Sequence, residues 1–398
     1  MSIKSIDQGG TWLNEGSADI KLLKKACDRK TNVSDVPLAT RVSEEIPIYD
    51  GDAIRHASSL EASSPQRIRA YQQEWAGVLL SGAGALVIEN GIDDIVLLDS
   101  VTDAFYQIIK REARTDSGAD HFAPQGSNTR IWNGHEKLCV EAPELFARYN
   151  ANAAMAQICR AWLGPGYQIT AQANIVHPGG QAQHCHRDYH MGFQTSERLY
   201  EYPAHVHAMS PMLTLQGAIA HSDMPIESGP TKLLPFSQTF LPGYLATARE
   251  DCVELFESAH KQLPLKKGDM LFFSPALMHA AGDNKTSDID RFANLVQVGS
   301  AYGRTMELLD KARMSIAVFP ELQKLQGTEG WTDTMTEYVI EATAEGYAFP
   351  ANMELEPPTS GLAPPSQQNL LSQSLREGDS PETFRDKVLA QQALKRSH

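Results

Sequence analysis

The chain has 398 residues, of which 42% are hydrophobic and 21% are charged. This composition is typical of a globular protein with a substantial core, and it excludes an intrinsically disordered chain. The formal net charge of −14, from 49 acidic and 35 basic residues, provides no electrostatic footprint for nucleic acid or an anionic membrane.

The sequence shows no pattern for membrane insertion or export. No window approaches the roughly 18 apolar residues that span a bilayer, and the first residues lack the apolar core of a secretory signal. The five cysteines share no CxxC spacing, so we expect free thiols in a reducing compartment. We therefore expect a cytoplasmic protein, a monomer or homo-oligomer, without nucleic-acid or membrane partners.

The first part of the chain predicts helices. Residues 1–45 are polar and weakly periodic, and we expect an arm packed on the domain surface. Ser64 and Pro65 predict the start of a helix, and a short buried strand follows at 85–89. Apolar residues at helical spacing predict a second helix around 98–108 and a third, unbroken one over 143–163.

The pattern changes after the third helix. From about 167 to 298, short apolar runs separated by Gly, Pro, Asn and Asp predict many short strands, and hence an α+β protein with a mainly β core, a sandwich or barrel. Residues 350–373 are expected to be irregular, and Ser380 to cap a final short helix. We divide the chain into the arm, a main domain at 46–349, and a C-terminal strap with a short helix at 350–398.

Two His-x-Asp sequences are candidate metal sites. Alternate residues of a strand project to one face, so His186 and Asp188 can present an imidazole and a carboxylate to one ion. With a distant histidine, this is the facial triad of non-haem iron(II) oxygenases. His221 and Asp223 have the same form. The alternate pairs His184/His186 and His205/His207 leave a cupin-type site open.

The segment 267–291 supplies a third ligand candidate. A turn leads into an apolar strand that ends at His279, and a loop rich in turn formers then precedes Arg291. A buried arginine there can grip a carboxylate through two charge-assisted hydrogen bonds.

Three blocks now give a resemblance: HPGGQAQHCHRD, ESGPTKLLPFSQ and GDMLFFSPALMHAAGDNKT followed by Arg291. Over about residues 65–300 the chain resembles the phytanoyl-CoA dioxygenase family, a branch of the iron(II)/2-oxoglutarate oxygenases. The resemblance implies a double-stranded β-helix (a cupin-like jelly roll) with supporting N-terminal helices. It also implies Fe(II) as cofactor, with 2-oxoglutarate and O2 as co-substrates. By position, it implies that His186, Asp188 and His279 bind the metal and that Arg291 anchors 2-oxoglutarate.

The chain departs from the family pattern in two places. Phe236 and Gln238 stand where the family commonly has Gly and His, and Ala281 stands where many relatives place a hydroxyl that touches the co-substrate. The second departure leaves part of the co-substrate contact to another group. Gln172 and Asn174 are our candidates, with ordinary strand positions as the alternative.

Substrate contacts are predicted from the loops around the β core. Arg130 can pair with a substrate acid or form a surface salt bridge, and Trp132 lies beside it in sequence. Tyr189 and His190 are expected to line the mouth of the site. The insert at 195–208 is a candidate lid, with structural or solvent-facing histidines.

A retained carboxylate at Asp188 implies hydroxylation of a small organic metabolite, whereas related halogenases have a small residue there; desaturation and ring formation use the same ligands. Two alternatives stay open. One is a cupin-like metal enzyme that uses His184, His186 and His279 without a keto acid. The other is a catalytically silent relative that serves as a binding protein.

Overall fold

A computed structural model describes residues 11–112, 126–358 and 361–396. The first ten residues of the predicted arm, and residues 359–360 and 397–398 of the predicted C-terminal segment, lie outside these ranges. The main sheet has the strand order β1-β2-β3-β8-β6-β10-β5-β4, and only β2 and β3 pair in parallel. Its strands are β1 (Arg41–Ser43), β2 (Ile46–Asp50), β3 (Ala85–Glu89), β4 (Asn128–Ile131), β5 (Gln168–Val176), β6 (Thr214–Ala220), β8 (Met270–Phe273) and β10 (Arg291–Gly299).

A second, smaller layer faces part of this sheet. Strands β7 (Lys232–Leu233) and β9 (His279–Ala280) pair with each other, and single bridges add His186 beside His279 and Lys261 beside Leu233. Between the layers lies an apolar cluster that includes Leu271 and Leu277. The chain therefore has a mixed α+β fold with a large, mostly antiparallel sheet, as its pattern of short apolar runs predicts.

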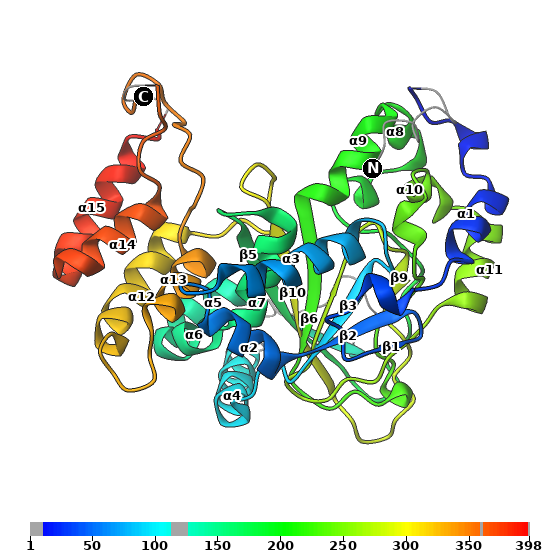
Figure 1. Ribbon diagram of the computed structural model, residues 1–398, viewed down its shortest axis with the longest axis horizontal. Helices are drawn as coiled ribbons and strands as arrows, with labels where there is room; N and C mark the ends of the chain where they lie inside the picture. The colour runs from blue at the N-terminus through cyan, green and yellow to red at the C-terminus, as the bar shows by residue number, and fades with distance from the viewer. Residues whose placement is uncertain (1–10, 113–125, 359–360, 397–398) are drawn as a thin grey trace.

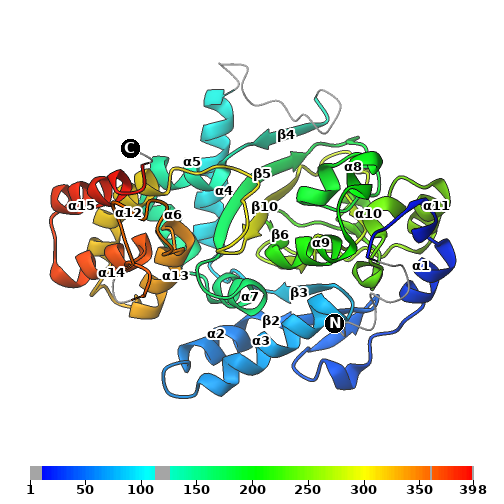
Figure 2. The ribbon, with the colours of Figure 1, turned by 90° about the horizontal axis from the view of Figure 1, so that it is seen from above.

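Helices cover the other face of the main sheet and both ends of the molecule (Figures 1 and 2). Helices α12, α14 and α15 pack together at one end, while α1 contacts α11 at the other. The longer helices are α1 (Ile20–Cys27), α2 (Gly51–Ser59), α3 (Pro65–Leu80), α4 (Ile95–Glu112), α5 (Gly134–Glu141), α6 (Pro143–Asn150), α7 (Ala153–Leu163), α11 (Glu250–Ala259), α12 (Lys311–Leu325), α13 (Asp333–Thr343), α14 (Gln367–Glu377) and α15 (Pro381–Ala393). Short helices are α8 (Ser196–Tyr200), α9 (Ala204–Met209) and α10 (Gly243–Ala246). Within the described ranges, no helix is both long and apolar enough to cross a membrane.

The predicted helix over 143–163 is wrong in one respect, because the structure divides it into α6 and α7. Asn150 donates from its side chain to the carbonyl of Phe146 within the last turn of α6. Asn152 then leaves the helical region, at φ −104° and ψ 118°, and its side chain accepts a hydrogen bond from the N–H of Met155. An asparagine that caps a new helix interrupts the backbone ladder without disturbing the apolar periodicity.

The C-terminal part is more helical than its composition suggests. Helices α12 and α13 have no counterpart among the predicted elements, and α14 begins at Gln367, inside the stretch that was expected to be irregular. Ser380 caps α15 as predicted, with Pro381 in its first turn. Phe384 of α15 stacks on Phe319 of α12 with ring centroids 4.1 Å apart, so this segment joins the large apolar cluster that lies under the main sheet.

Candidate metal centre and active-site cavity

Two histidines and one aspartate converge where the smaller layer meets the main sheet. His186, Asp188 and His279 each offer one ligand atom, and these atoms all lie within 4.8 Å of one another. His186 and His279 exchange backbone hydrogen bonds of 3.0 Å in both directions, so the pairing of their segments sets the spacing of the rings. The Asp188 carboxylate lies 3.8 Å from Nε2 of His186 and 3.5 Å from Nε2 of His279.

Both imidazoles are oriented for a metal. Nδ1 of His186 lies 2.7 Å from the carbonyl of His184, and Nδ1 of His279 lies 2.8 Å from the carbonyl of Leu277. A carbonyl can only accept, so each Nδ1 carries the proton and each Nε2 lone pair is left for a ligand. Histidines that ligate metals are commonly held in this way. The donor set therefore fits a divalent metal ion.

The protonation states agree with this donor set. Burial lowers the pKa of His186, and the neighbouring His279 lowers it further. Burial alone would raise the pKa of Asp188, but His279 and His186, when they are protonated, donate to the carboxylate or attract it and hold its pKa below its usual range. A neutral imidazole and an ionised carboxylate are the forms that bind a metal.

Arg187, between the two ligands in sequence, points away from the metal site. It is 2% exposed, and its guanidinium donates to the carbonyls of Ser237 and Phe240 and lies over the ring of Tyr244. Burial lowers the pKa of Arg187 to about 10. The guanidinium fills the space beside Gly243, where an added Cβ would lie 1.7 Å from its Cζ. Arg187 thus fixes the segment that presents His186 and Asp188.

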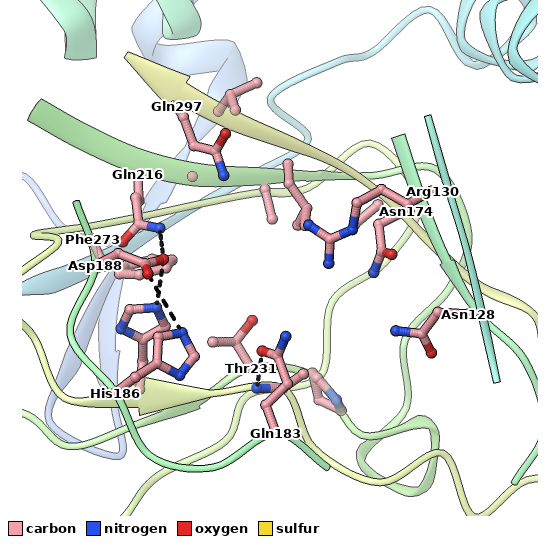
Figure 3. Close-up of a pocket in the computed structure, with 18 of the residues that line it drawn as sticks. Asn128, Arg130, Asn174, Gln183, His186, Asp188, Gln216, Thr231, Phe273 and Gln297 are labelled. Carbon is pink, nitrogen blue, oxygen red and sulfur yellow. Dashed lines mark hydrogen bonds and ion pairs between the residues drawn. The ribbon is translucent and has the colours of Figure 1, made fainter. Parts of the chain in front are cut away.

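A cavity of about 690 Å³ opens beside the three candidate metal ligands. The main sheet forms one wall with Gln216, Ala218, Ala293, Leu295 and Gln297. Figure 3 shows His186 and Asp188 at one end, and Arg130, Asn174 and Asn128 at the other. The cavity is therefore long enough to hold more than one small molecule beside the metal ligands.

Arg291 also lines the cavity, from the start of β10. It is 7% exposed, and its Nη1 donates to the carbonyls of Ser228 and Gly282 at 3.1 and 3.3 Å. In the described part of the chain, no carboxylate lies within ion-pair distance of it, and burial lowers its pKa to about 10. A buried cation without an acid is costly, so a ligand carboxylate is the natural partner.

The two candidate amides on β5 differ in position. Asn174 lines the cavity, and its Oδ1 accepts no hydrogen bond from the described residues. Gln172 does not line it, because its amide oxygen accepts from Arg130 at 2.8 Å and its nitrogen lies against Met306. The structure therefore offers Asn174 alone to a ligand.

Among the predicted substrate residues, only Arg130 lines the cavity. Arg130 is buried, with 6% of its surface exposed, and its guanidinium lies over the ring of Trp132. Tyr189 and His190 do not line the cavity. Both have positive φ, 55° and 34°, and this sharp turn carries them away while Phe193 reaches the cavity.

The insert at 195–208 does not line the cavity either. Its helices α8 and α9 pack through Leu199 and Ala204 into a cluster with Leu13 and Leu23 of the N-terminal arm. His205 is exposed, whereas Nε2 of His207 is 3.1 Å from the carbonyl of Leu199. These histidines are solvent-facing and structural, respectively, as expected.

The rival pair forms no metal site. Nδ1 of His221 is 2.8 Å from the Thr102 hydroxyl, Nε2 is 3.0 Å from the Tyr149 hydroxyl, and the ring stacks on Phe292. Burial lowers the pKa of His221 to about 3. His184, which the cupin-type alternative requires, is exposed and does not belong to the metal-binding group found among the described residues.

Gln216 and Thr231 are among the cavity residues that sequence reasoning missed. Nε2 of Gln216 donates to Oδ2 of Asp188 at 2.6 Å. Thr231 lies one position before Lys232, which pairs with Ala280, so the same register sets Thr231 opposite Ala281; both line the cavity. The available signal for Gln216 was a polar side chain within the otherwise apolar strand sequence TLQGAIA.

The family departures have a local explanation. Phe236 has φ 68° and ψ −7°, a left-handed conformation that glycine adopts without strain. The amide of Gln238 donates to the carbonyl of Gly82 at 2.9 Å. The N–H of Phe236 donates to the carbonyl of Ala83, so both residues fasten the segment 227–238 to the residues that follow α3.

Two imidazoles and one carboxylate on an antiparallel β core form the donor set of mononuclear non-haem iron enzymes. The chain belongs to the phytanoyl-CoA dioxygenase (PhyH) family, whose sequence model matches residues 80–293. It is 28% identical over 141 residues to the dioxygenase AndF of Emericella variicolor, a match that covers 34% of this chain and 44% of that protein. The aligned part thus spans less than half of this relative's length.

Three solved structures are also similar. The α-ketoglutarate-dependent epimerase SnoN from nogalamycin biosynthesis is 14% identical, with a TM-score of 0.40 over 60% of this chain and 82% of that one. HygX from Streptomyces hygroscopicus, with nickel and 2-oxoglutarate bound, is 15% identical, with a TM-score of 0.38 over 58% and 88%. EctD from S. alaskensis is 19% identical, with a TM-score of 0.41 over 58% and 78%.

Proposed function

We propose that the protein is an iron(II)/2-oxoglutarate-dependent dioxygenase that hydroxylates a small organic metabolite and converts 2-oxoglutarate to succinate and CO2. The observation that supports this most is the group of His186, Asp188 and His279, with both Nε2 atoms and the carboxylate directed at one point. Family membership agrees with it. We also infer that the main sheet and the smaller layer form a double-stranded β-helix.

Five polar side chains that line the cavity have a role in this proposal. His186, Asp188 and His279 would hold the iron, which would supply the oxidising chemistry together with 2-oxoglutarate and oxygen. Arg291 binds the distal carboxylate of 2-oxoglutarate, which compensates its buried charge. Thr231 supplies a hydroxyl from across the β7–β9 ladder, where Ala281 provides none.

The protein's remaining contribution is to hold the substrate and exclude water. The apolar wall of Ala218, Ala293 and Leu295 lies beside the metal ligands and favours an unreactive C–H-bearing part of the substrate there. A retained carboxylate at Asp188 occupies the position that a halide would need. Hydroxylation is therefore the reaction that this donor set favours.

Anaerobically prepared, metal-free protein tests the proposal when it is supplied with iron(II), 2-oxoglutarate and air, and succinate is measured. We expect succinate from the parent protein and none from Asp188→Ala. The Arg291→Leu variant should form succinate only at much higher 2-oxoglutarate concentrations than the parent protein needs. His205→Ala, at an exposed position, is the matched control and should resemble the parent protein.

The same assay separates the alternatives. A cupin-like enzyme would depend on His184 and would ignore 2-oxoglutarate, so His184→Ala would remove its activity. A silent relative would bind iron without forming succinate. Either result would overturn the proposal.

A further inference from the structure

Three carboxamides project from the main sheet into the cavity: Asn174 from β5, Gln216 from β6 and Gln297 from β10. They are 7%, 5% and 6% exposed, and the side-chain oxygen of each accepts no hydrogen bond from the described residues. Buried amide oxygens in folded proteins nearly always have a partner. Amide oxygens that face a cavity and lack a hydrogen-bond donor therefore indicate a ligand that donates to them.

Gln216 and Gln297 form a pair next to the metal site. They are directly opposite each other in the β6–β10 register, so their side chains are neighbours on one face of the sheet. Figure 3 shows both extending from adjacent strands above Asp188. Because only an amide N–H can donate to the Asp188 carboxylate, the orientation of Gln216 is fixed and its Oε1 is the free atom.

Gln297 differs from Gln216 because neither end of its carboxamide is hydrogen-bonded within the described residues. It therefore offers a ligand one acceptor and one donor side by side. A secondary amide, a lactam or an alcohol has the complementary donor and acceptor. Gln216 adds a second acceptor, which again calls for an N–H or O–H group on the ligand.

The charges nearby determine the kind of group. A carboxylate or phosphate placed at this pair would meet the fixed amide oxygen of Gln216 and, behind Gln216, the Asp188 carboxylate, with only the NH2 group of Gln297 to donate to it. Those contacts repel an anion. The wall next to the pair is apolar, with Ala218 and Leu295 in the next positions on the same face.

We propose, on the basis of the proposed function, that Gln216 and Gln297 determine substrate specificity, and that the substrate is a neutral molecule with an amide N–H or hydroxyl group beside the metal and an apolar body against the sheet. A site that must satisfy buried amides rejects an analogue without the donor far more strongly than an apolar pocket rejects a missing methyl group. Acidic substrates and acyl-coenzyme A thioesters are not complementary to this pair.

Two lactams that differ in one donor test the proposal. The full chain, loaded with zinc(II) and 2-oxoglutarate, is mixed with 2-piperidinone or N-methyl-2-piperidinone, and ligand-observed saturation-transfer NMR measures binding. We expect the unsubstituted lactam to bind about tenfold more tightly than the N-methyl analogue, the value of one hydrogen bond. Gln297→Leu should reduce this preference, because only the Gln216 oxygen then remains as an acceptor, and the double variant Gln216→Leu/Gln297→Leu should abolish it.

Gln168→Leu is the matched control. Gln168 lies on β5 outside the cavity, and its amide is already bonded to the carbonyls of Ser300 and Gly303. It should lower the melting temperature and keep the lactam preference, whereas Gln297→Leu should not lower the melting temperature. Equal binding of the two lactams, no lactam binding, or an equal loss of melting temperature in both variants would overturn the inference.

Succinate formation by the same preparation with iron(II) separates this inference from the proposed function. Succinate without a lactam preference refutes the specificity pair alone. A lactam preference without succinate refutes the dioxygenase assignment and leaves the binding site in place.

Discussion

His186 and His221 each begin a His-x-Asp sequence, but their nitrogens meet different partners. One nitrogen of His186 is bonded to a backbone carbonyl, and the other points at Asp188 and His279 beside a cavity. Both nitrogens of His221 are bonded to hydroxyl groups inside the core. A histidine can bind a metal only when one nitrogen is left without a protein partner, and the surrounding elements, not the motif, decide this.

The largest expected difference between the two pairs is in their carboxylates. Asp188→Asn should lower the affinity for iron(II) by more than the 10–100-fold typical of changes outside the ligand shell. Asp223→Asn should leave it unchanged, because Asp223 is exposed and accepts a hydrogen bond from the N–H of Lys267 at the surface. Calorimetric titration with iron(II) under nitrogen measures both, and equal losses would contradict the assignment.

The next largest effect is expected at Arg187, which holds the segment that carries His186 and Asp188. Gly243→Ala places a methyl group where the Arg187 guanidinium lies, so Arg187 must move and its bonds to two carbonyls must break. We expect a stability loss of about 1–3 kcal/mol and a roughly 10–100-fold lower metal affinity. Denaturant unfolding and metal titration measure the two effects. Lower stability with unchanged metal affinity would show that Arg187 does not position the ligands.

A smaller effect is expected at the co-substrate contact. Thr231→Val removes a hydroxyl and keeps the shape, so the KM for 2-oxoglutarate should rise roughly tenfold, the value of one hydrogen bond to a charged group. The kcat of succinate formation should change little. Thr231→Ser should behave like the parent protein. A KM that is unchanged in Thr231→Val would remove Thr231 from the co-substrate site.

The smallest effect is expected at His221, in stability alone. Its folded-state pKa, lowered to about 3 by burial, lies below the value near 6.5 of an unfolded histidine. Between these two pH values the unfolded chain binds a proton at His221 that the folded chain does not bind. The free energy of unfolding is therefore highest above pH 6.5 and declines as the pH falls toward 3. His221→Phe should therefore show a weaker decline of the melting temperature from pH 7 to 5.

His135, whose pKa burial lowers to about 4, contributes a similar decline that this variant retains. Iron affinity and succinate formation at pH 7 should be unchanged in His221→Phe. A full decline of the melting temperature in this variant, or a loss of metal, would contradict the structural role of His221.

The three residues that we propose as metal ligands could be brought together from the sequence because the signals for them are local. Alternation in one extended segment brings His186 and Asp188 together, and the strand that ends at His279 has its own turn and loop signals. Arg291 was a candidate for the same reason, because it comes directly after the loop of turn-forming residues that follows His279. The three blocks also matched a family pattern, so position alone separated the first pair from the second.

The remaining parts of the site depend on pairing between distant strands. Thr231 meets Ala281, and Gln216 meets Gln297, only through the registers of β7–β9 and β6–β10. Gln172 is a candidate co-substrate contact by sequence, but its amide oxygen accepts a hydrogen bond from Arg130 of β4. The positive φ angles at Tyr189 and His190 could not be predicted, because neither residue is a glycine.

Crystals grown without oxygen, with iron(II) and 2-oxoglutarate, allow the iron to be located directly by anomalous scattering. We predict one peak, in contact with Nε2 of His186, Nε2 of His279 and the carboxylate of Asp188. A peak elsewhere in the chain, or no peak at these three side chains, would contradict the account.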